Sequence, residues 1–471
     1  MREVFDAMRE AARVISGAIR AVPTVVRGIS SALRGASGAI PAAPTAAKRR
    51  TCAIVAIIAL AVACALPAAV PARAELLVPM DLSQSNHLKA YGFAYHVLEA
   101  GENVRWLLNY RSGSFLLPDR PDFALEAQAR GVTIERVGGA DVTSILGEIE
   151  QGNMEIVLLE KAPKIAIYAP PNKQPWDDAV MMALDYAGIP YKIIYDGEVL
   201  RGELSRYDWL HLHHEDFTGQ YGKFYAGFRH AEWYIQQQIL FEKIAASLGF
   251  DKVSEEKKAV ARAIKEYVRA GGFLFAMCSA TDSIDIALAA GGIDIAPREY
   301  DHDGTTPNCN DLLDYQKCFA FEKFRLIMDP YIYEFSDIDM TAAAAQRGET
   351  RDYFTLFEFA AKYDPVPTML VQNHVSVIKG FMGQTTGYRR SLLKTKVIVM
   401  GEVEGKDEVR YIHGNFGMGT FTFLGGHDPE DYQHFVGDPP TDLGLYPNSP
   451  GYRLILNNIL FPAAKKKERK T

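Results

Sequence analysis

Short, wholly apolar runs alternate with amphipathic stretches through most of this 471-residue chain. The run Phe273–Met277 is apolar throughout, whereas Val253–Arg269 places apolar residues at helical spacing with charged residues between them. Runs of the first kind are typical of strands buried on both faces, and stretches of the second kind are typical of the helices that cover them. The alternation therefore predicts an α/β protein with a doubly wound, mainly parallel sheet.

The same patterns predict the remaining elements. We expect strands at residues 76–81, 104–109, 131–134, 164–168, 191–195, 207–212, 397–402 and 420–424. Helices are expected at 87–100, 176–187, 279–290 and 452–460, with a helix-rich stretch at 230–270. Residues 297–395 lose the alternation and carry Pro, Asp, Gly and many aromatic residues, which is typical of an insertion or a lid.

The predicted organisation has six segments. They are a basic extension with a signal peptide or membrane anchor (1–74), an additional N-terminal α/β unit (75–160), the first part of the core (161–296), an aromatic-rich insertion or lid (297–395), the last part of the core (396–462) and a basic tail (463–471).

The N-terminal segment has the three parts of a secretory signal. Basic residues 48–50 precede the uncharged apolar run 53–66, and residues 71–74 end in a small-residue cleavage pattern. We expect an exported, periplasmic or envelope-associated protein, with cleavage after Ala74 or, alternatively, an uncleaved membrane anchor. Residues 1–47 are a basic amphipathic helix on a membrane surface, a transit peptide or an over-long start; these alternatives stay open.

Composition narrows the classes of partner. Hydrophobic residues make up 48% and charged residues 23%, which excludes a wholly disordered, collagen-like or coiled-coil protein. Of 51 basic and 58 acidic residues, ten basic and three acidic ones lie in 1–74, which leaves 41 basic against 55 acidic in the body. An acidic body argues against a nucleic acid or an anionic lipid surface as the main partner, so membrane attachment is expected only through the N-terminal segment.

Three cysteines remain after the expected cleavage. Cys309 and Cys318 stand nine positions apart in a loop-rich stretch and are candidates for a disulfide, which would leave Cys278 unpaired. Cys278 directly follows the predicted strand Phe273–Met277 and precedes a helix, the position of the nucleophile in a strand–turn–helix elbow. A helix N-terminus there would lower the thiol pKa; the alternative is a small buried residue with no reactivity.

Four segments occur in an order that resembles class I glutamine amidotransferase-like domains. These are residues 164–168, 207–212, 271–278 and 420–428, and they look most like the trehalose-utilisation branch, with a glycine pair before the central strand and a terminal Gly-His-Asp. The resemblance implies that Cys278 attacks a carboxamide, that His427 acts as the base, and that Asp428 or Glu430 orients His427. The family has His-x-Glu where this chain has His-Asp-Pro-Glu, so the third member stays open.

The whole mature chain also resembles exported bacterial proteins labelled asparagine synthetase B. Residues 79–87, 173–178 and 211–221 carry this likeness. A true synthetase needs an N-terminal Cys to cleave glutamine and a Ser-Gly-Gly-x-Asp-Ser loop for ATP, and this sequence has neither. The resemblance therefore does not imply synthetase activity.

A dense group of metal-ligating side chains follows the predicted strand 207–212. His211, His213 and Glu215 are the candidate ligands of Zn²⁺ or Fe²⁺, and no other cofactor is expected. Strand alternation would place His211 and His213 on one face and His214 on the other. The alternative is a polar loop that hydrogen bonds the first unit.

The predicted function is hydrolysis or transfer at a carboxamide or related carbonyl of a small molecule, glycan or peptide. Its alternatives are a non-catalytic envelope protein that binds a glycan or peptide, and a metal-dependent hydrolase. The candidate substrate-binding residues are Gln174, Trp176, Asp177, His213, His214, Glu215 and Ser279.

Overall fold

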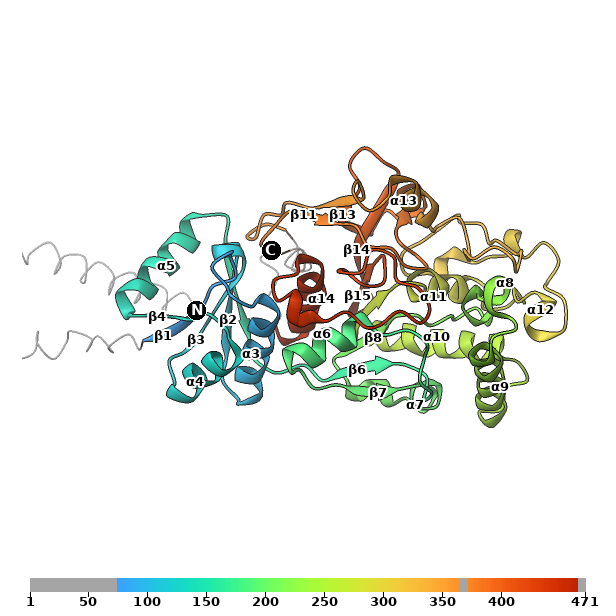
Figure 1. Ribbon diagram of the computed structural model, residues 1–471, viewed down its shortest axis with the longest axis horizontal. Helices are drawn as coiled ribbons and strands as arrows, with labels where there is room; N and C mark the ends of the chain where they lie inside the picture. The colour runs from blue at the N-terminus through green and yellow to red at the C-terminus, as the bar shows by residue number, and fades with distance from the viewer. Residues whose placement is uncertain (1–73, 365–371, 465–471) are drawn as a thin grey trace, which may run out of the picture. The chain divides into compact units, whose positions relative to one another are not determined.

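The computed structural model describes residues 74–364 and 372–464, which form a mixed α/β protein with two sheets (Figure 1). Nearly all of the expected signal or anchor and most of the basic tail lie outside the described residues. None of the described helices is long and apolar enough to cross a membrane.

The first sheet is antiparallel and has five strands in the order β4-β1-β3-β2-β5. The strands are β1 (Glu75–Val78), β2 (Val104–Leu108), β3 (Ser114–Pro118), β4 (Glu135–Val137) and β5 (Glu155–Leu159), and the helices of this unit are α3 (His87–Glu99), α4 (Pro121–Arg130) and α5 (Gly139–Gln151). Successive side chains of each strand point to opposite faces of this sheet. Leu76 and Trp106 therefore join the core that contains α3, whereas Leu77 and Leu107 pack with Ile145 of α5 on the other face.

The strand predicted at 131–134 forms slightly later, as β4. Gly131 has a φ of +70° and caps the C-terminus of α4, and the backbone N–H of Thr133 donates to the Gln84 side chain at 2.8 Å. Because these residues are used to end the helix and bind the neighbouring loop, sheet pairing begins only at Glu135.

The second sheet has ten strands in the order β11-β10-β13-β14-β15-β9-β8-β6-β7, with β12 paired to β14. The strands are β6 (Ile165–Tyr168), β7 (Lys192–Ile194), β8 (Trp209–Leu212), β9 (Phe273–Met277), β10 (Tyr353–Leu356), β11 (Val377–Lys379), β12 (Tyr388–Arg389), β13 (Ile398–Glu402), β14 (Glu408–Phe416) and β15 (Gly419–Leu424). The pairs from β7 to β15 are parallel, which confirms a parallel core, but β14 and the strands beyond it are antiparallel. Residues expected to form an insertion therefore extend the same sheet through β10, β11 and β12.

Helices cover both faces of the parallel core. The helices of this part of the chain are α6 (Ala179–Ala187), α7 (Asp196–Leu200), α8 (Tyr225–Phe228), α9 (Glu232–Ser247), α10 (Val253–Arg269), α11 (Ala280–Ala289), α12 (Arg298–Asp301), α13 (Thr341–Arg347) and α14 (Pro450–Leu460). Phe273 and Phe275 pack in the core that includes α6 and α14, whereas Leu274 and Ala276 pack with α10 and α11. Two covered faces explain why β9 is apolar at every position.

The three described cysteines are free and buried, so the predicted pairing of Cys309 with Cys318 is wrong. The Cys318 thiol donates to the Asp285 carbonyl at 3.3 Å, while the Cys309 sulfur lies 3.9 Å from the Met328 sulfur. Each sulfur packs into its own part of the core, because the chain between them turns through two short helical segments.

Candidate functional site

The carboxyl ends of β6, β8, β9 and β15 meet at one edge of the sheet because these strands are parallel. In chain order the parallel strands run 2-1-3-4-5, and ligands of such sheets bind beyond the carboxyl ends where the order reverses. The loops after these strands carry Asp177 and Asp178, then His213 and His214, then Cys278 and finally His427. This edge of the sheet therefore holds most of the candidate catalytic and metal-binding residues expected from the sequence.

Three imidazoles converge at this edge. The ring centroids of His213 and His214 are 4.0 Å apart, and that of His427 lies 4.8 Å and 4.7 Å from them. One nitrogen from each ring lies within 4.8 Å of the other two, an arrangement able to hold a metal ion. Nε2 of His213 and both ring nitrogens of His427 are buried without a hydrogen-bond partner in the described part of the chain. We call these three residues the histidine cluster.

His211 and His213 lie on one side, as expected, because both contact Asp178, but the expected placement of His214 opposite them is wrong. Strand β8 ends at Leu212, so alternation no longer applies to the residues that follow it. The His213 and His214 rings stack with an interplanar angle of 13°, while His211 stays in the strand and contacts the Phe275 carbonyl through Nδ1 at 3.1 Å.

Burial keeps two rings of the cluster, His214 and His427, neutral. Together with the neighbouring His213 and His214, it holds the pKa of His427 well below its usual range. Burial likewise lowers the pKa of His214, with His213 adding to the effect. Neutral imidazole is the form that binds a metal ion, so these two rings are in the state that a metal requires.

Two adjacent carboxylates flank the cluster. Asp178 caps α6 by accepting the backbone N–H groups of Val180 and Met181, and its Oδ1 lies 3.2 Å from Nδ1 of His213 and 3.5 Å from Nε2 of His211. Burial alone would raise the pKa of Asp178, but His211 and His213 hold it well below its usual range. This side chain therefore both starts a helix and orients a histidine of the cluster.

Asp177 reaches a histidine that the sequence analysis did not single out. Its Oδ1 lies 2.9 Å from Nε2 of His434, whose Nδ1 lies 2.9 Å from Asp431. Contact with Asp177, reinforced by Asp431, raises the pKa of His434 to about 9. The centroid of the His434 ring lies 4.4 Å from that of His427, so a fourth imidazole able to bind a metal adjoins the three of the cluster. The density of His and Asp between residues 427 and 438 was the available sequence signal.

Glu215 does not join these groups. Its Oε2 accepts the backbone N–H of His213 at 2.9 Å, and burial raises its pKa to about 8. Of the three predicted metal ligands, only His213 belongs to the histidine cluster. His211 lies outside it but contacts Asp178, as His213 does.

Cys278 occupies the bend expected of it. Its backbone φ is +50°, a left-handed conformation that a non-glycine residue rarely adopts, and such strain is common at functional sites. The Cys278 sulfur is buried and accepts the backbone N–H of Gln384 at 3.3 Å, and burial raises the thiol pKa to about 11. Ser279, which follows it, is fully buried, and its hydroxyl has no hydrogen-bond partner among the described residues.

The two candidates for the third member of a triad point elsewhere. Asp428 accepts the Thr441 hydroxyl at 2.7 Å and the backbone N–H of Glu430 at 2.9 Å. Neither ring nitrogen of His427 has a hydrogen-bond partner among the described residues, so no hydrogen bond joins it to Cys278, Asp428 or Glu430. The ring instead faces the other histidines.

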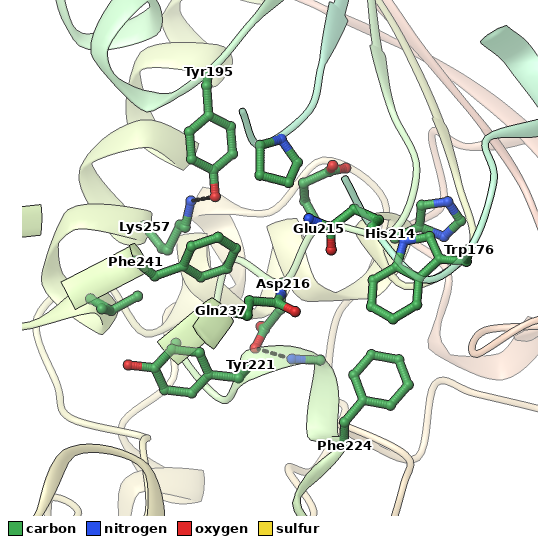
Figure 2. Close-up of a pocket in the computed structure, with 15 residues that line it drawn as sticks. Trp176, Tyr195, His214, Glu215, Asp216, Tyr221, Phe224, Gln237, Phe241 and Lys257 are labelled. Atoms are coloured by element: carbon green, nitrogen blue, oxygen red, sulfur yellow. Dashed lines mark hydrogen bonds between the residues drawn. The ribbon is translucent and has the colours of Figure 1, made fainter. Parts of the chain in front are cut away.

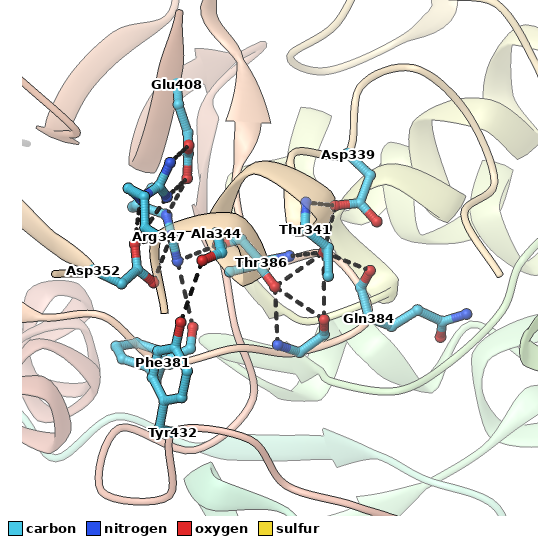
Figure 3. Close-up of polar contacts among 12 residues, drawn as sticks. Asp339, Thr341, Ala344, Arg347, Asp352, Phe381, Gln384, Thr386, Glu408 and Tyr432 are labelled. Atoms are coloured by element: carbon cyan, nitrogen blue, oxygen red, sulfur yellow. Dashed lines mark hydrogen bonds and ion pairs between the residues drawn. The ribbon is translucent and has the colours of Figure 1, made fainter. Parts of the chain in front are cut away.

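Buried ion pairs hold the loop against which His427 rests (Figure 3). The backbone N–H of His427 donates to Met382 at 3.0 Å. In the same loop, the backbone carbonyl of Thr386 accepts a hydrogen bond from the Arg410 guanidinium at 3.0 Å. Arg410 also pairs with Asp352 at 2.9 Å and with Glu408 at 2.7 Å. The network connects the cluster to strand β14 and to Asp352, which directly precedes β10.

A cavity adjoins the cluster at His214 (Figure 2). It is small, and its lining includes Gln174, Trp176 and Glu215 from the predicted substrate-binding set. The Trp176 ring lies 5.5 Å from that of His214. Of the predicted substrate-binding residues, the structure thus brings Gln174, Trp176, His214 and Glu215 together and leaves Asp177, His213 and Ser279 outside the lining.

No protein-family model matches this chain, and no curated protein matches it. Among solved structures, it is similar to the cytoplasmic protein STM3548 from Salmonella typhimurium, with 12% identity, a TM-score of 0.32, and coverage of 64% of this chain and 100% of that one. It is also similar to the cytoplasmic protein STM1381 from Salmonella typhimurium LT2, with 11% identity, a TM-score of 0.33, and the same coverage. At these values neither structure assigns a family or a function to the chain.

Proposed function

We propose that this protein is a metal-dependent hydrolase that acts at a carboxamide or related carbonyl, with one Zn²⁺ or Fe²⁺ held by His213, His214 and His427. The observation that carries the proposal is the convergence of three imidazoles, two of them buried and one half-buried; the two buried rings have nitrogens without a hydrogen-bond partner in the described part of the chain. Leaving such atoms unpaired is costly, and a metal ion would satisfy them together.

The contacts around the cluster favour one ligand atom on each ring. Nε2 of His214 lies 2.7 Å from the Asp177 carbonyl and donates to it, which leaves Nδ1 for a metal. Nδ1 of His213 faces Asp178 at 3.2 Å, which leaves Nε2. Carboxylate or carbonyl partners on the far side of a ligating histidine are the usual way in which proteins set its tautomer and direction.

Three imidazoles are the ligand set of a catalytic zinc site with one position open to water or substrate. A bound ion of this kind lowers the pKa of its water to about 7 and polarises a carbonyl oxygen. In this chain Asp178 would hold His213 in place, and Glu215, next to the cluster along the chain, would stand at the cavity wall.

Metal analysis of purified protein tests the proposal. We expect about one ion per chain after reconstitution and dialysis, and less than a tenth of that in His427→Ala. His413→Gln is the matched control: His413 is fully buried in the same sheet, where it contacts the Thr422 hydroxyl, outside the cluster. Because His427→Ala removes a buried ring, His214→Ala, at a half-buried ring, repeats the test. Two results would contradict the proposal. One is wild-type protein that lacks stoichiometric metal, and the other is metal retained by both His427→Ala and His214→Ala.

A second candidate is covalent catalysis by Cys278, in which the thiol attacks the carbonyl as in amidotransferase-like domains. The left-handed φ of +50° at this elbow favours it. It predicts that a small electrophile labels Cys278 faster than Cys309 or Cys318 at neutral pH and that His427→Ala slows the labelling. If activity survives Cys278→Ser and the electrophile labels Cys278 no faster than it does in unfolded protein, covalent catalysis is excluded and the metal mechanism is the one that stands.

We also infer that the parallel half of the second sheet has the class I glutamine amidotransferase-like fold, which the strand order and the elbow at Cys278 support. Export through residues 1–74 remains part of the proposal and rests on their signal-like pattern. A periplasmic or envelope location in cell fractionation would agree with it.

A further inference from the structure

A second set of metal-ligating side chains adjoins the histidine cluster. One ligand atom each from Asp177, His427 and His434 lies within 4.8 Å of the other two. The side chains of His434 and Asp177 are 2% and 12% exposed, and His427 is 6% exposed. Two imidazoles and one carboxylate are a ligand set that proteins use for first-row divalent cations such as Fe²⁺. We call these three residues the second ligand group.

The Asp177 carboxylate lies in the interior without the hydrogen bonds that usually accompany a buried carboxylate. Both of its oxygens are buried, and neither accepts a hydrogen bond from the described residues. The adjacent Asp178 differs, because its Oδ1 accepts the backbone N–H groups of Val180 and Met181 at 2.8 Å and 3.0 Å. Since burial removes the water that would solvate a carboxylate, Asp177 is the one of the two that a cation would stabilise most.

The contact between Asp177 and His434 has the spacing of two metal ligands. Nδ1 of His434 donates to Oδ2 of Asp431 at 2.9 Å, which fixes the direction of the ring. Nε2 then lies 2.9 Å from Oδ1 of Asp177, yet neither atom has a hydrogen-bond partner in the described part of the chain, so their relative direction does not suit a hydrogen bond. Two ligand atoms that each lie about 2.1 Å from one ion, at a right angle, are about 3.0 Å apart.

His427 is able to serve both sets of ligands. Neither of its ring nitrogens has a hydrogen-bond partner among the described residues. Its ring centroid lies 4.7 Å from that of His214 and 4.4 Å from that of His434. The two nitrogens of an imidazole are distinct ligand atoms, so one can bind the ion of the histidine cluster and the other a second ion, once the ring has released its remaining proton.

Backbone hydrogen bonds hold together the two loops that supply the second ligand group. The backbone N–H of Gly437 donates to the Pro175 carbonyl at 2.8 Å, which attaches the loop after His434 to the loop before Asp177. The backbone N–H of Phe435 donates to the Asp438 side chain at 2.8 Å. The fold therefore places these ligands beside one another, as a metal site requires.

We propose that Asp177, His427 and His434 bind a second divalent cation of the Mn²⁺ or Fe²⁺ type, with Asp431 as the positioning residue of His434. The inference goes beyond the single ion of the proposed function and rests on it where His427 is shared. Both histidines must release a proton to bind this ion, so it is held more weakly than the first and is lost on dialysis. A carboxylate and near-octahedral spacing favour Mn²⁺ as the probe.

Titration of zinc-loaded protein with Mn²⁺ tests the inference. Protein that has been reconstituted with Zn²⁺ and dialysed is titrated while free Mn²⁺ is followed by its electron paramagnetic resonance signal. Elemental analysis of the same samples measures the zinc that stays bound. We expect the protein to bind about one Mn²⁺ per chain with its zinc content unchanged.

Four variants locate the second ion. Asp177→Asn and His434→Gln each change a ligand and should weaken Mn²⁺ binding by at least about tenfold. Asp431→Asn, which loosens the hold on His434, should weaken it by about tenfold, and all three should retain zinc. Asp438→Asn is the matched control, because it changes a carboxylate of the same loop outside the second ligand group and keeps an acceptor for the Phe435 backbone N–H. Its Mn²⁺ affinity should equal that of wild type.

The outcomes separate this inference from the proposed function. If wild type retains no zinc but binds Mn²⁺, and Asp177→Asn and His434→Gln weaken that binding, the second ligand group is supported and the proposed function is overturned. Retained zinc with no Mn²⁺ bound, or with Mn²⁺ bound equally by these two variants, would overturn the inference alone. So would Mn²⁺ that replaces zinc one for one, or zinc lost from His434→Gln, since a single ion would then use both sets of ligands. An equal loss of Mn²⁺ affinity in Asp438→Asn would also overturn it.

Discussion

Removing the Arg410 guanidinium should destabilise the protein by breaking a charge-balanced buried network. Arg410 is 1% exposed and pairs with Asp352 and Glu408, both fully buried. Arg347, whose side chain is 17% exposed, is the other cation that both carboxylates contact (Figure 3). In Arg410→Met two buried carboxylates would share one cation, which leaves one negative charge without compensation.

The expected magnitude follows from that imbalance. Breaking a buried ion pair by removing one partner costs about 3–5 kcal/mol. At about 2.1 cal/mol/K per residue, unfolding of roughly 400 residues has an entropy of about 0.8 kcal/mol/K. The melting temperature of Arg410→Met should therefore fall by about 4–6 °C. Metal affinity should fall with it, because Arg410 also holds the loop that accepts the His427 backbone N–H.

Differential scanning calorimetry of three proteins checks this reasoning. Arg390→Met is the matched control, since Arg390 and Glu402 form an ion pair whose side chains are 45% and 42% exposed. Such a surface pair contributes about 0–1 kcal/mol, so the control should melt within about 1 °C of wild type. If Arg410→Met melts as Arg390→Met does, the network is not the stabilising element that its burial implies.

Two further predictions concern the first unit. Burial lowers the pKa of His87, which is fully buried, to about 4; because the unfolded value is about 6.5, the associated stability is complete above that pH and is lost as pH falls towards 4. From this group alone, the free energy of unfolding should drop by about 2 kcal/mol between pH 7 and pH 5, and urea titrations of His87→Gln should show a correspondingly smaller drop. Gly92→Ala should destabilise by at least about 1–3 kcal/mol, because a Cβ on α3 would lie 1.9 Å from the Ala187 carbonyl oxygen of α6. Gly147→Ala in α5, where a Cβ meets nothing within 4 Å, should instead stabilise by about 0.5–1 kcal/mol in the same titration; equal effects of the two substitutions would contradict the close packing of α3 on α6.

Local pattern was sufficient for much of the parallel core. Strand β9 has the bounds expected for it, Phe273–Met277, because a five-residue apolar run between a glycine pair and a helix permits little else. The same pattern placed Cys278 at the bend and His213 beyond the end of β8. Strand polarity alone then brings the ends of these strands to one edge of the sheet.

The pattern was insufficient where residues far apart in the chain had to meet. Residues 408–416 were not expected to form a strand, yet β14 is the longest of the sheet and begins its antiparallel half. His434 and Asp431 lie in a loop, where neither period 2 nor period 3.6 applies, so their contact with Asp177 had no periodic signal.

The spacing of apolar residues along the chain thus determined which segments become strands and helices, because the residues that form one buried face of a strand or helix lie close together in the sequence. The partner of His427 was settled by three-dimensional packing. A family likeness assigned it to Cys278 and to either Asp428 or Glu430, whereas the folded loop turns its ring towards His213 and His214, more than two hundred residues earlier in the chain. The direction of a side chain on a loop depends on contacts with distant segments, such as the bond from the His427 backbone to Met382, which exist only after folding.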